Sequence, residues 1–194
     1  KPNKDQSVAD IGCAAGRQLV KLSPRIGEGV GTDIASSFVA TARTYAKEHG
    51  LTNLSFEHAP VETLPFPDNK FDAVICAEVL EHVLDKDAAL KELLRITTSG
   101  GSLIITVPNM NADATWWGRL LRLLGKRQFI SLEHFTMEEL RKHGDAHVRQ
   151  FTKESMLKWL AEYPVNVEAI SSVSHIDGPY FDFLLKFPLH TSFG

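Results

Sequence analysis

The sequence has 194 residues, 43% of them hydrophobic and 23% charged, which is ordinary globular composition and enough chain to bury one sizeable core. Its formal net charge of −3 provides no general attraction to nucleic acid or anionic lipid, so we expect no nucleic-acid partner. Cys13 and Cys76 each lie in an apolar run, which favours reduced thiols in a cytoplasmic protein over a disulfide framework.

The chain opens on an apolar run at residues 8–11, a turn of small residues at 12–16 and a short helical stretch at 17–22. Small side chains allow the backbone of such a turn to approach a ligand closely. A strand that leads into this turn also presents free backbone N–H groups. By itself, the pattern indicates a site for an adenosine-type cofactor.

Strands and helices then alternate up to residue 107. Ser36 or Ser37 is expected to cap the second helix, and Gly100-Gly101 to stop the third. Strands separated by helices imply a parallel sheet covered on both faces. The expected strands cover 29–33, 54–58, 71–76 and 102–107, and the expected helices cover 36–49 and 86–97, with a helical turn at 78–82.

Beyond Pro108-Asn109 the regular alternation ends. Residues 112–124 have the pattern of an amphipathic helix, and residues 135–143 that of a further short helix. Thr152 is expected to cap a helix that ends near residue 163. A strand is expected to follow at 165–173. At 181–187 the aromatic residues 181, 183 and 187 favour a strand slightly over a helix, which stays the alternative.

Several polar or small-residue features fall at the same edge of this sheet, where each strand ends. In an open parallel sheet, ligands bind outside the carboxyl ends of the strands. Asp33 lies 21 residues after Gly12, the spacing at which a carboxylate on the second strand accepts hydrogen bonds from both ribose hydroxyls. The features are the turn 12–16, Asp33, the segment 59–66, the loop after Cys76 and Pro108-Asn109.

Four segments together resemble a known family in order and spacing. They read VADIGCAAG, GVGTDIASSFVATAR, PVETLPFPDNKFDAVICAEVLEHV and GGSLIITVPN. They are similar to the class I S-adenosylmethionine-dependent methyltransferases, in the small-molecule and lipid group called methyltransferase type 11, closely over 7–109 and more loosely over 147–173. The resemblance implies a single α/β domain over 1–194. It has a Rossmann-like, doubly wound, mostly parallel seven-stranded sheet, helices on both faces and a helical insertion after the fifth strand.

The resemblance also implies a set of residues that hold S-adenosylmethionine. Asp33 would hold the ribose, and Ile34 would pack on the adenine. The family commonly has Asp-Ala-Glu where this chain has Pro60-Val61-Glu62, so adenine recognition would depend on the backbone of Val61 and Glu62 and on apolar contacts. The implied cofactor-binding residues are Asp10, Gly12, Cys13, Ala14, Gly16, Asp33, Ile34, Pro60, Val61, Glu62, Ala77 and Glu78.

Three histidines are candidates for a general base: His82, His134 and His147. For each of them a structural or surface role is the alternative reading. Glu78, Glu81 and His82 would share one face of a helix, a spacing that permits metal ligation. Metal-free relatives carry a similar motif, so we expect no metal.

The expected reaction is an in-line methyl transfer to a small-molecule or lipid-like acceptor, with oxygen favoured as the acceptor atom and S-adenosylhomocysteine as the product. Residues 110–146, with Trp116 and Trp117, are expected to form a lid over the substrate, and peripheral membrane contact through 112–124 is the alternative. Two other functions stay open. One is an NAD-dependent oxidoreductase, although the turn lacks the three-glycine fingerprint. The other is a non-catalytic methyltransferase-like binding module, for which Pro60 is the hint.

Overall fold

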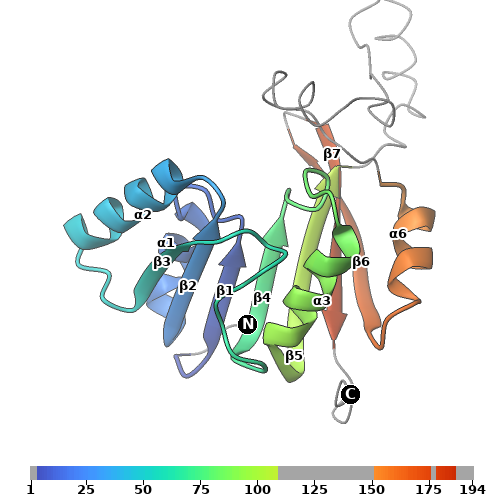
Figure 1. The fold of residues 1–194 in the computed structure, drawn as a ribbon, viewed down its shortest axis with the longest axis horizontal. Coiled ribbons are helices and arrows are strands. Elements are labelled where there is room, and N and C mark those ends of the chain that lie inside the picture. The colour runs from blue at the N-terminus through green and yellow to red at the C-terminus, as the bar shows by residue number, and fades with distance from the viewer. Residues whose placement is uncertain (1–3, 109–150, 176–177, 187–194) are drawn as a thin grey trace, which may run out of the picture.

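The structure is a computed structural model that describes residues 4–108, 151–175 and 178–186. These residues contain one seven-stranded sheet in the order β3-β2-β1-β4-β5-β7-β6 (Figure 1). Strands β1 to β5 pair in parallel, whereas β7 runs antiparallel to both β5 and β6, so the expected mostly parallel sheet is confirmed. The strands are β1 (Ser7–Ile11), β2 (Glu28–Asp33), β3 (Leu54–His58), β4 (Phe71–Ala77), β5 (Thr97–Pro108), β6 (Asn166–His175) and β7 (Gly178–Lys186).

Helices cover both faces of the sheet, as the alternating pattern predicts (Figure 1). Leu19, Val39 and Ala42 bury the apolar side of α1 and α2 in one core cluster. Leu93 and Met156 belong to the second cluster, which α3 and α6 form on the opposite face. The helices are α1 (Arg17–Leu22), the short 3₁₀ helix η1 (Ser23–Arg25), α2 (Ser36–Glu48), α3 (Lys86–Ile96) and α6 (Lys153–Leu160).

The start of α2 differs from the expected serine cap. Ala35 is the N-cap residue, and no side chain caps the helix. The N–H of Ala35 donates instead to Oδ1 of Asp33 at 2.8 Å. The expectation for Ser36 and Ser37 is therefore wrong, because the carboxylate at the end of β2 already satisfies the backbone at this turn. The expected Thr152 cap of α6 is confirmed by a capping box with Ser155.

The end of α3 also differs from the prediction. The helix ends at Ile96 because Thr97 is already extended, with φ −81° and ψ 132°, and begins β5. The pairing with β4 then shifts between Thr97 and Ser102, and Gly100 adopts φ 78° within this irregular stretch. The two glycines therefore shape a bulge in β5 and do not stop the helix.

The loop after β4 does not form the expected helical turn over 78–82. Glu78 has a φ of 57°, in the left-handed region, so it cannot share a helix face with Glu81 and His82. A single turn is closed by the N–H of His82, which donates to the carbonyl oxygen of Val79 at 2.9 Å. The two glutamates are placed differently, since Glu81 is buried and Glu78 is half-buried.

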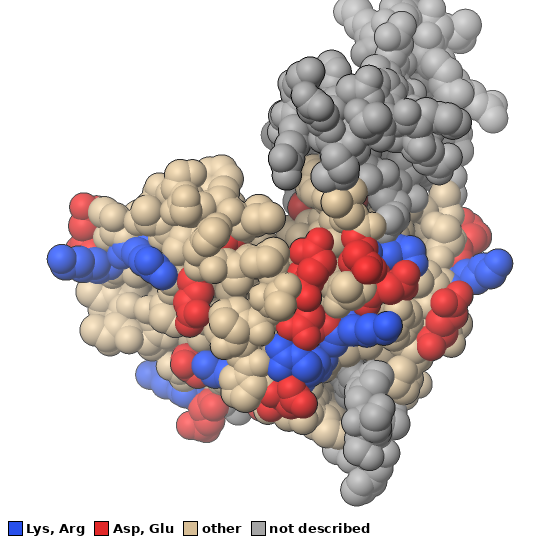
Figure 2. Space-filling model, in the orientation of Figure 1, with Lys and Arg blue, Asp and Glu red and all other residues tan. Residues whose placement is uncertain are grey.

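Several predictions concern parts of the chain outside the described residues. These are the lid insertion 110–146, the helices over 112–124 and 135–143, and the residues Trp116, Trp117, His134 and His147. Within the described part, no helix is long and apolar enough to cross a membrane. On the face shown in Figure 2, the basic side chains are interspersed with acidic ones and form no continuous basic surface.

Candidate active site

A cavity of about 460 Å³ opens at the carboxyl ends of β1, β2 and β4, within the range of small-molecule sites. Its walls come from the turn after β1, the end of β2 with the start of α2, the segment after β3 and the loop after β4. Of the predicted residues, Gly12, Ala14, Asp33, Ile34, Val61, Glu62, Glu78 and His82 line it.

The turn after β1 is held against the second strand by its backbone. The N–H groups of Gly12 and Cys13 both donate to the carbonyl oxygen of Thr32, each at 2.8 Å. The N–H of Ala14 donates to Oδ2 of Asp33, also at 2.8 Å. The sequence pattern predicted a tight turn here, and these three bonds fix its position relative to β2.

Two glycines are required in this turn by both conformation and space. Gly12 and Gly16 have φ values of 77° and 74°, which L residues with side chains rarely adopt. A Cβ at Gly12 would lie 2.2 Å from Cγ2 of Val79, and one at Gly16 would lie 2.6 Å from the ring of Phe56. Ala14 also has a positive φ, 46°, and thus carries a backbone strain that a glycine there would avoid.

Asp33 is buried, and each of its carboxylate oxygens accepts one backbone N–H, from Ala14 and from Ala35. An ionised carboxylate offers about four acceptor positions in total. The two backbone bonds therefore orient Asp33 and leave it able to accept further hydrogen bonds from hydroxyl groups in the cavity.

Two carboxyl groups near the cavity are deeply buried. Burial, with a smaller contribution from the charge of Asp33, raises the pKa of Asp10 to about 7. Burial likewise raises the pKa of Glu81 to about 7. Oδ2 of Asp10 has no hydrogen-bond partner within the described part of the chain. A bound group with N–H donors or positive charge would satisfy such a carboxyl.

The charge of the cavity favours one of two kinds of cofactor. Among the described residues, its lining contains the carboxylates of Asp33, Glu62 and Glu78 and no lysine or arginine. This acidic lining fits a ligand that carries positive charge, such as a sulfonium with an α-ammonium group. It does not fit the pyrophosphate of NAD, which requires positive charge or several converging N–H donors.

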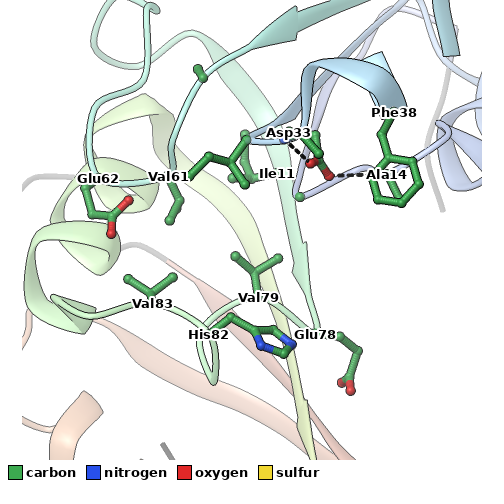
Figure 3. Close-up of a pocket in the computed structure, with 14 residues that line it drawn as sticks. Ile11, Ala14, Asp33, Phe38, Val61, Glu62, Glu78, Val79, His82 and Val83 are labelled. Carbon is green, nitrogen blue, oxygen red and sulfur yellow. Dashed lines mark hydrogen bonds between the residues drawn. The ribbon is translucent and has the colours of Figure 1, made fainter. Parts of the chain in front are cut away.

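The close-up in Figure 3 shows how the walls face one another. Asp33 and Ala14 lie on one side, and Val79 and His82 lie on the opposite side. Val61 and Glu62 form the end wall, where the resemblance expects the adenine to lie. The arrangement can enclose an elongated ligand between the turn after β1 and the loop after β4.

Some predicted residues do not line the cavity, and some lining residues were not predicted. Phe38 on the first turn of α2 is 49% exposed and Ile34 is 71% exposed, so two large apolar side chains face solvent beside Asp33. The signal that could have identified Phe38 is a second large apolar residue, four positions after Ile34, at the start of the helix that follows this strand end. The predicted residues outside the lining are Asp10, Cys13, Gly16, Pro60 and Ala77, and the unpredicted lining residues include Phe38, Val79 and Val83.

The described residues hold no group of three histidine, cysteine or acidic side chains that could bind a metal ion. Both cysteines are buried free thiols, and burial is the largest cause of the raised pKa of Cys13 and Cys76. Neither thiol therefore has the character of a nucleophile.

The fold, with its cavity at the carboxyl ends of β1, β2 and β4, is that of a class I methyltransferase. Comparison with known proteins gives the family: residues 9–105 match the methyltransferase domain family called Methyltransf_11, and the chain belongs to it. The cofactor that accompanies this assignment is S-adenosylmethionine, as expected from the sequence.

Individual relatives agree with the family assignment. The uncharacterized methyltransferase YcgJ of Bacillus subtilis (strain 168) is 27% identical over 169 residues, which cover 87% of this chain and 59% of that protein. The ubiquinone/menaquinone biosynthesis C-methyltransferase UbiE of Pseudomonas aeruginosa (strain LESB58) is 35% identical over 151 residues, covering 71% of this chain and 59% of that protein. The chain thus spans less than two thirds of the length of these relatives.

Solved structures share the fold. Magnesium protoporphyrin IX methyltransferase (ChlM) from Synechocystis PCC 6803, with S-adenosylhomocysteine bound, superimposes with a TM-score of 0.70 at 18% identity. The superposition covers 96% of this chain and 75% of that chain.

Proposed function

We propose that this protein transfers the methyl group of S-adenosylmethionine to a small-molecule or lipid-like acceptor. The observation that carries the proposal is the acidic cavity at the carboxyl ends of β1, β2 and β4, with Asp33 oriented by two backbone bonds. The cofactor supplies an activated sulfonium methyl group when bound. The protein then has mainly to bind and orient the two reactants.

Different walls of the cavity would hold different parts of the cofactor. Asp33 would accept hydrogen bonds from the ribose hydroxyls, and Ile34 would pack on one face of the adenine. Val61 and Glu62 would border the adenine edge through their backbone. The turn at Gly12 would face the methionine part, and the carboxyl of Asp10 lies buried just before this turn without a hydrogen-bond partner for Oδ2 among the described residues.

For the acceptor we propose a hydroxyl group, methylated at oxygen, with His82 as the base that removes its proton. His82 is exposed at the rim of the cavity, on the wall opposite Asp33 (Figure 3). The apolar side chains of Val79 and Val83 beside it favour an acceptor with an apolar body. The insertion 110–146 belongs to this proposal as the cover of the acceptor.

A carbon atom is the second candidate for the methylated position. It is favoured by the similarity to a relative named as a C-methyltransferase of ubiquinone and menaquinone biosynthesis. A phenolate or enolate is nucleophilic at its oxygen and at the carbon next to the oxygen-bearing carbon. Removal of the same hydroxyl proton therefore prepares methylation at either atom.

Two measurements test the proposal. Calorimetric titration should show binding of S-adenosylhomocysteine and none of NAD, and the reverse result would refute a methyltransferase. Turnover of methyl-labelled S-adenosylmethionine against phenols, glycosides and lipids should then identify an acceptor class, and NMR of the product should locate the methyl group on oxygen or carbon. Binding of the cofactor without turnover on any acceptor would favour the non-catalytic binding module.

A further inference from the structure

The segment that follows β3 cannot hold itself in place by strand pairing. It contains Pro60, Pro65 and Pro67, and proline has no backbone N–H to donate to a neighbouring strand. The carbonyl groups of Leu64 and Phe66, each directly before a proline, still need donors because both residues are buried.

Two side chains from the last turns of α3 satisfy this segment. The guanidinium of Arg95 donates to the carbonyl oxygens of Phe66 at 2.6 Å and of Leu64 at 3.1 Å. The carboxylate of Glu92 accepts the N–H of Leu64 at 2.8 Å, so Leu64 is held through both its backbone groups. Arg95 and Glu92 thus supply hydrogen bonds of the kind that a neighbouring strand would otherwise provide to this segment.

Arg95 and Glu92 also fix each other. Nε and Nη2 of Arg95 donate to the two oxygens of Glu92 at 2.6 and 2.8 Å, a bidentate pair with one preferred geometry. The Arg95 guanidinium holds the pKa of Glu92 below its usual value, so Glu92 stays ionised at neutral pH. Arg95 and Glu92 therefore form one rigid ion pair on α3, the Arg95–Glu92 pair.

The Arg95–Glu92 pair holds the chain directly after the residues that form the end wall of the cavity. Glu62 and Leu64 are two positions apart, and the N–H of Thr63 donates back to the carbonyl oxygen of Pro60 at 3.2 Å, so this short stretch is one compact turn. Val61 is 7% exposed and belongs to the same core cluster as Leu64. The position of Leu64 is therefore coupled to that of Val61 and Glu62 through this turn.

We infer that Arg95 and Glu92 are positioning residues for the cofactor, which set the Val61–Glu62 wall at the distance that recognises the adenine edge. The inference rests on the proposed function, since it takes the ligand of the cavity to be an adenosyl compound. Neither side chain lines the cavity, so both act only through the segment that they hold.

The experiment measures recognition of the adenine edge separately from general stability. S-adenosylhomocysteine and its deaminated analogue S-inosylhomocysteine differ only at that edge, where an amino donor becomes a carbonyl acceptor and N1 gains a proton. Parent protein should prefer S-adenosylhomocysteine by about tenfold or more, because a site built for one donor pattern rejects its reverse.

Arg95→Lys keeps the positive charge but loses the planar fork, and Glu92→Gln keeps the size but loses the charge. Each should weaken binding of S-adenosylhomocysteine by about tenfold, because binding must then also order the Val61–Glu62 wall, and should reduce the preference over S-inosylhomocysteine. Both affinities are measured by calorimetry on protein that is shown to be folded by its thermal unfolding.

Two variants serve as matched controls. Asp68→Asn removes the negative charge beside Arg95 at a side chain that is 68% exposed, and it leaves the Oδ1 acceptor and the Arg95–Glu92 pair in place. Asp87→Asn removes the negative charge from a different network on the same helix, where Oδ1 of Asp87 accepts from Trp159 and Tyr163 at 2.7 and 2.6 Å. Both controls should keep the parent preference.

The outcomes are distinct. An unchanged preference in Arg95→Lys and Glu92→Gln would overturn the inference, as would an equal loss in Asp87→Asn, which would indicate general destabilisation. If the parent protein binds no S-adenosylhomocysteine, the proposed function itself is refuted. Loss of preference in the two α3 variants alone supports a positioning role.

Discussion

Ala14 and Asp33 are joined by a 2.8 Å hydrogen bond from the backbone N–H of Ala14 to Oδ2 of the carboxylate. This bond connects the turn after β1 with the end of β2, the two parts of the chain that border the cofactor cavity. Together with the bond from Ala35 to Oδ1, it makes Asp33 both a residue that orders the turn after β1 and the acceptor proposed for the ribose.

Asp33→Asn should therefore weaken both binding and folding. Asparagine offers one acceptor oxygen, so one of the two backbone N–H groups loses its partner and the ribose loses an ionised acceptor. We expect S-adenosylhomocysteine to bind about 10- to 100-fold more weakly, and the free energy of unfolding to fall by about 1–3 kcal/mol. Calorimetry and urea denaturation measure the two effects.

The control for this variant is Glu57→Gln, since Glu57 lies on β3 and does not line the cavity. It should keep the parent affinity. If Asp33→Asn binds S-adenosylhomocysteine as tightly as the parent protein does, Asp33 does not hold the ribose.

The glycines offer a test of the turn geometry. Gly16→Ala would place a methyl group 2.6 Å from the Phe56 ring, at a φ of 74°. Gly50→Ala meets nothing within 4 Å at a φ of 64°, so it isolates the cost of the backbone conformation. We expect a loss of about 1–2 kcal/mol at Gly50 and of about 3 kcal/mol or more at Gly16, measured by urea denaturation. Equal losses of unfolding free energy in the two variants would mean that the turn and the Phe56 ring accommodate the added methyl group without further cost.

The sequence predicted the order of strands and helices up to β5 and the edge of the sheet where the cavity lies, because both follow from hydrophobic periodicity. It misplaced features that depend on contacts between distant segments. Gly100 shapes a bulge because β5 pairs with β4 from Thr97 onward. Likewise, nothing local to Leu64 indicates that Arg95 holds it.

Glu81→Gln should change how stability depends on pH. The pKa of Glu81 is raised from 4.5 to about 7 in the folded protein, so between these values the folded state binds more protons than the unfolded state. The ionisation of Glu81 therefore lowers the free energy of unfolding as the pH rises through that window. The full loss is present above about pH 7. Glutamine removes the cost, and the variant should be more stable than the parent by about 1–3 kcal/mol at high pH.

Urea denaturation at pH 5 and pH 8 checks this expectation, and the advantage of Glu81→Gln should be much smaller at pH 5. Glu154→Gln, at an exposed position of α6, is the control and should show no such difference. A Glu81→Gln protein that is less stable than the parent at both pH values would show that the ionised carboxylate is required in the fold.

His82→Gln tests the proposed base once an acceptor has been identified. Glutamine can replace the hydrogen bonds of the imidazole but cannot take up a proton at neutral pH. Turnover should fall by about 100-fold or more, whereas affinity for S-adenosylhomocysteine should stay at the parent value, because the proposed role concerns the acceptor. His49→Gln, at the end of α2 and outside the cavity, should leave turnover unchanged. Full turnover in His82→Gln would assign His82 a structural role and leave His134 and His147 as the remaining candidates among the histidines predicted from the sequence.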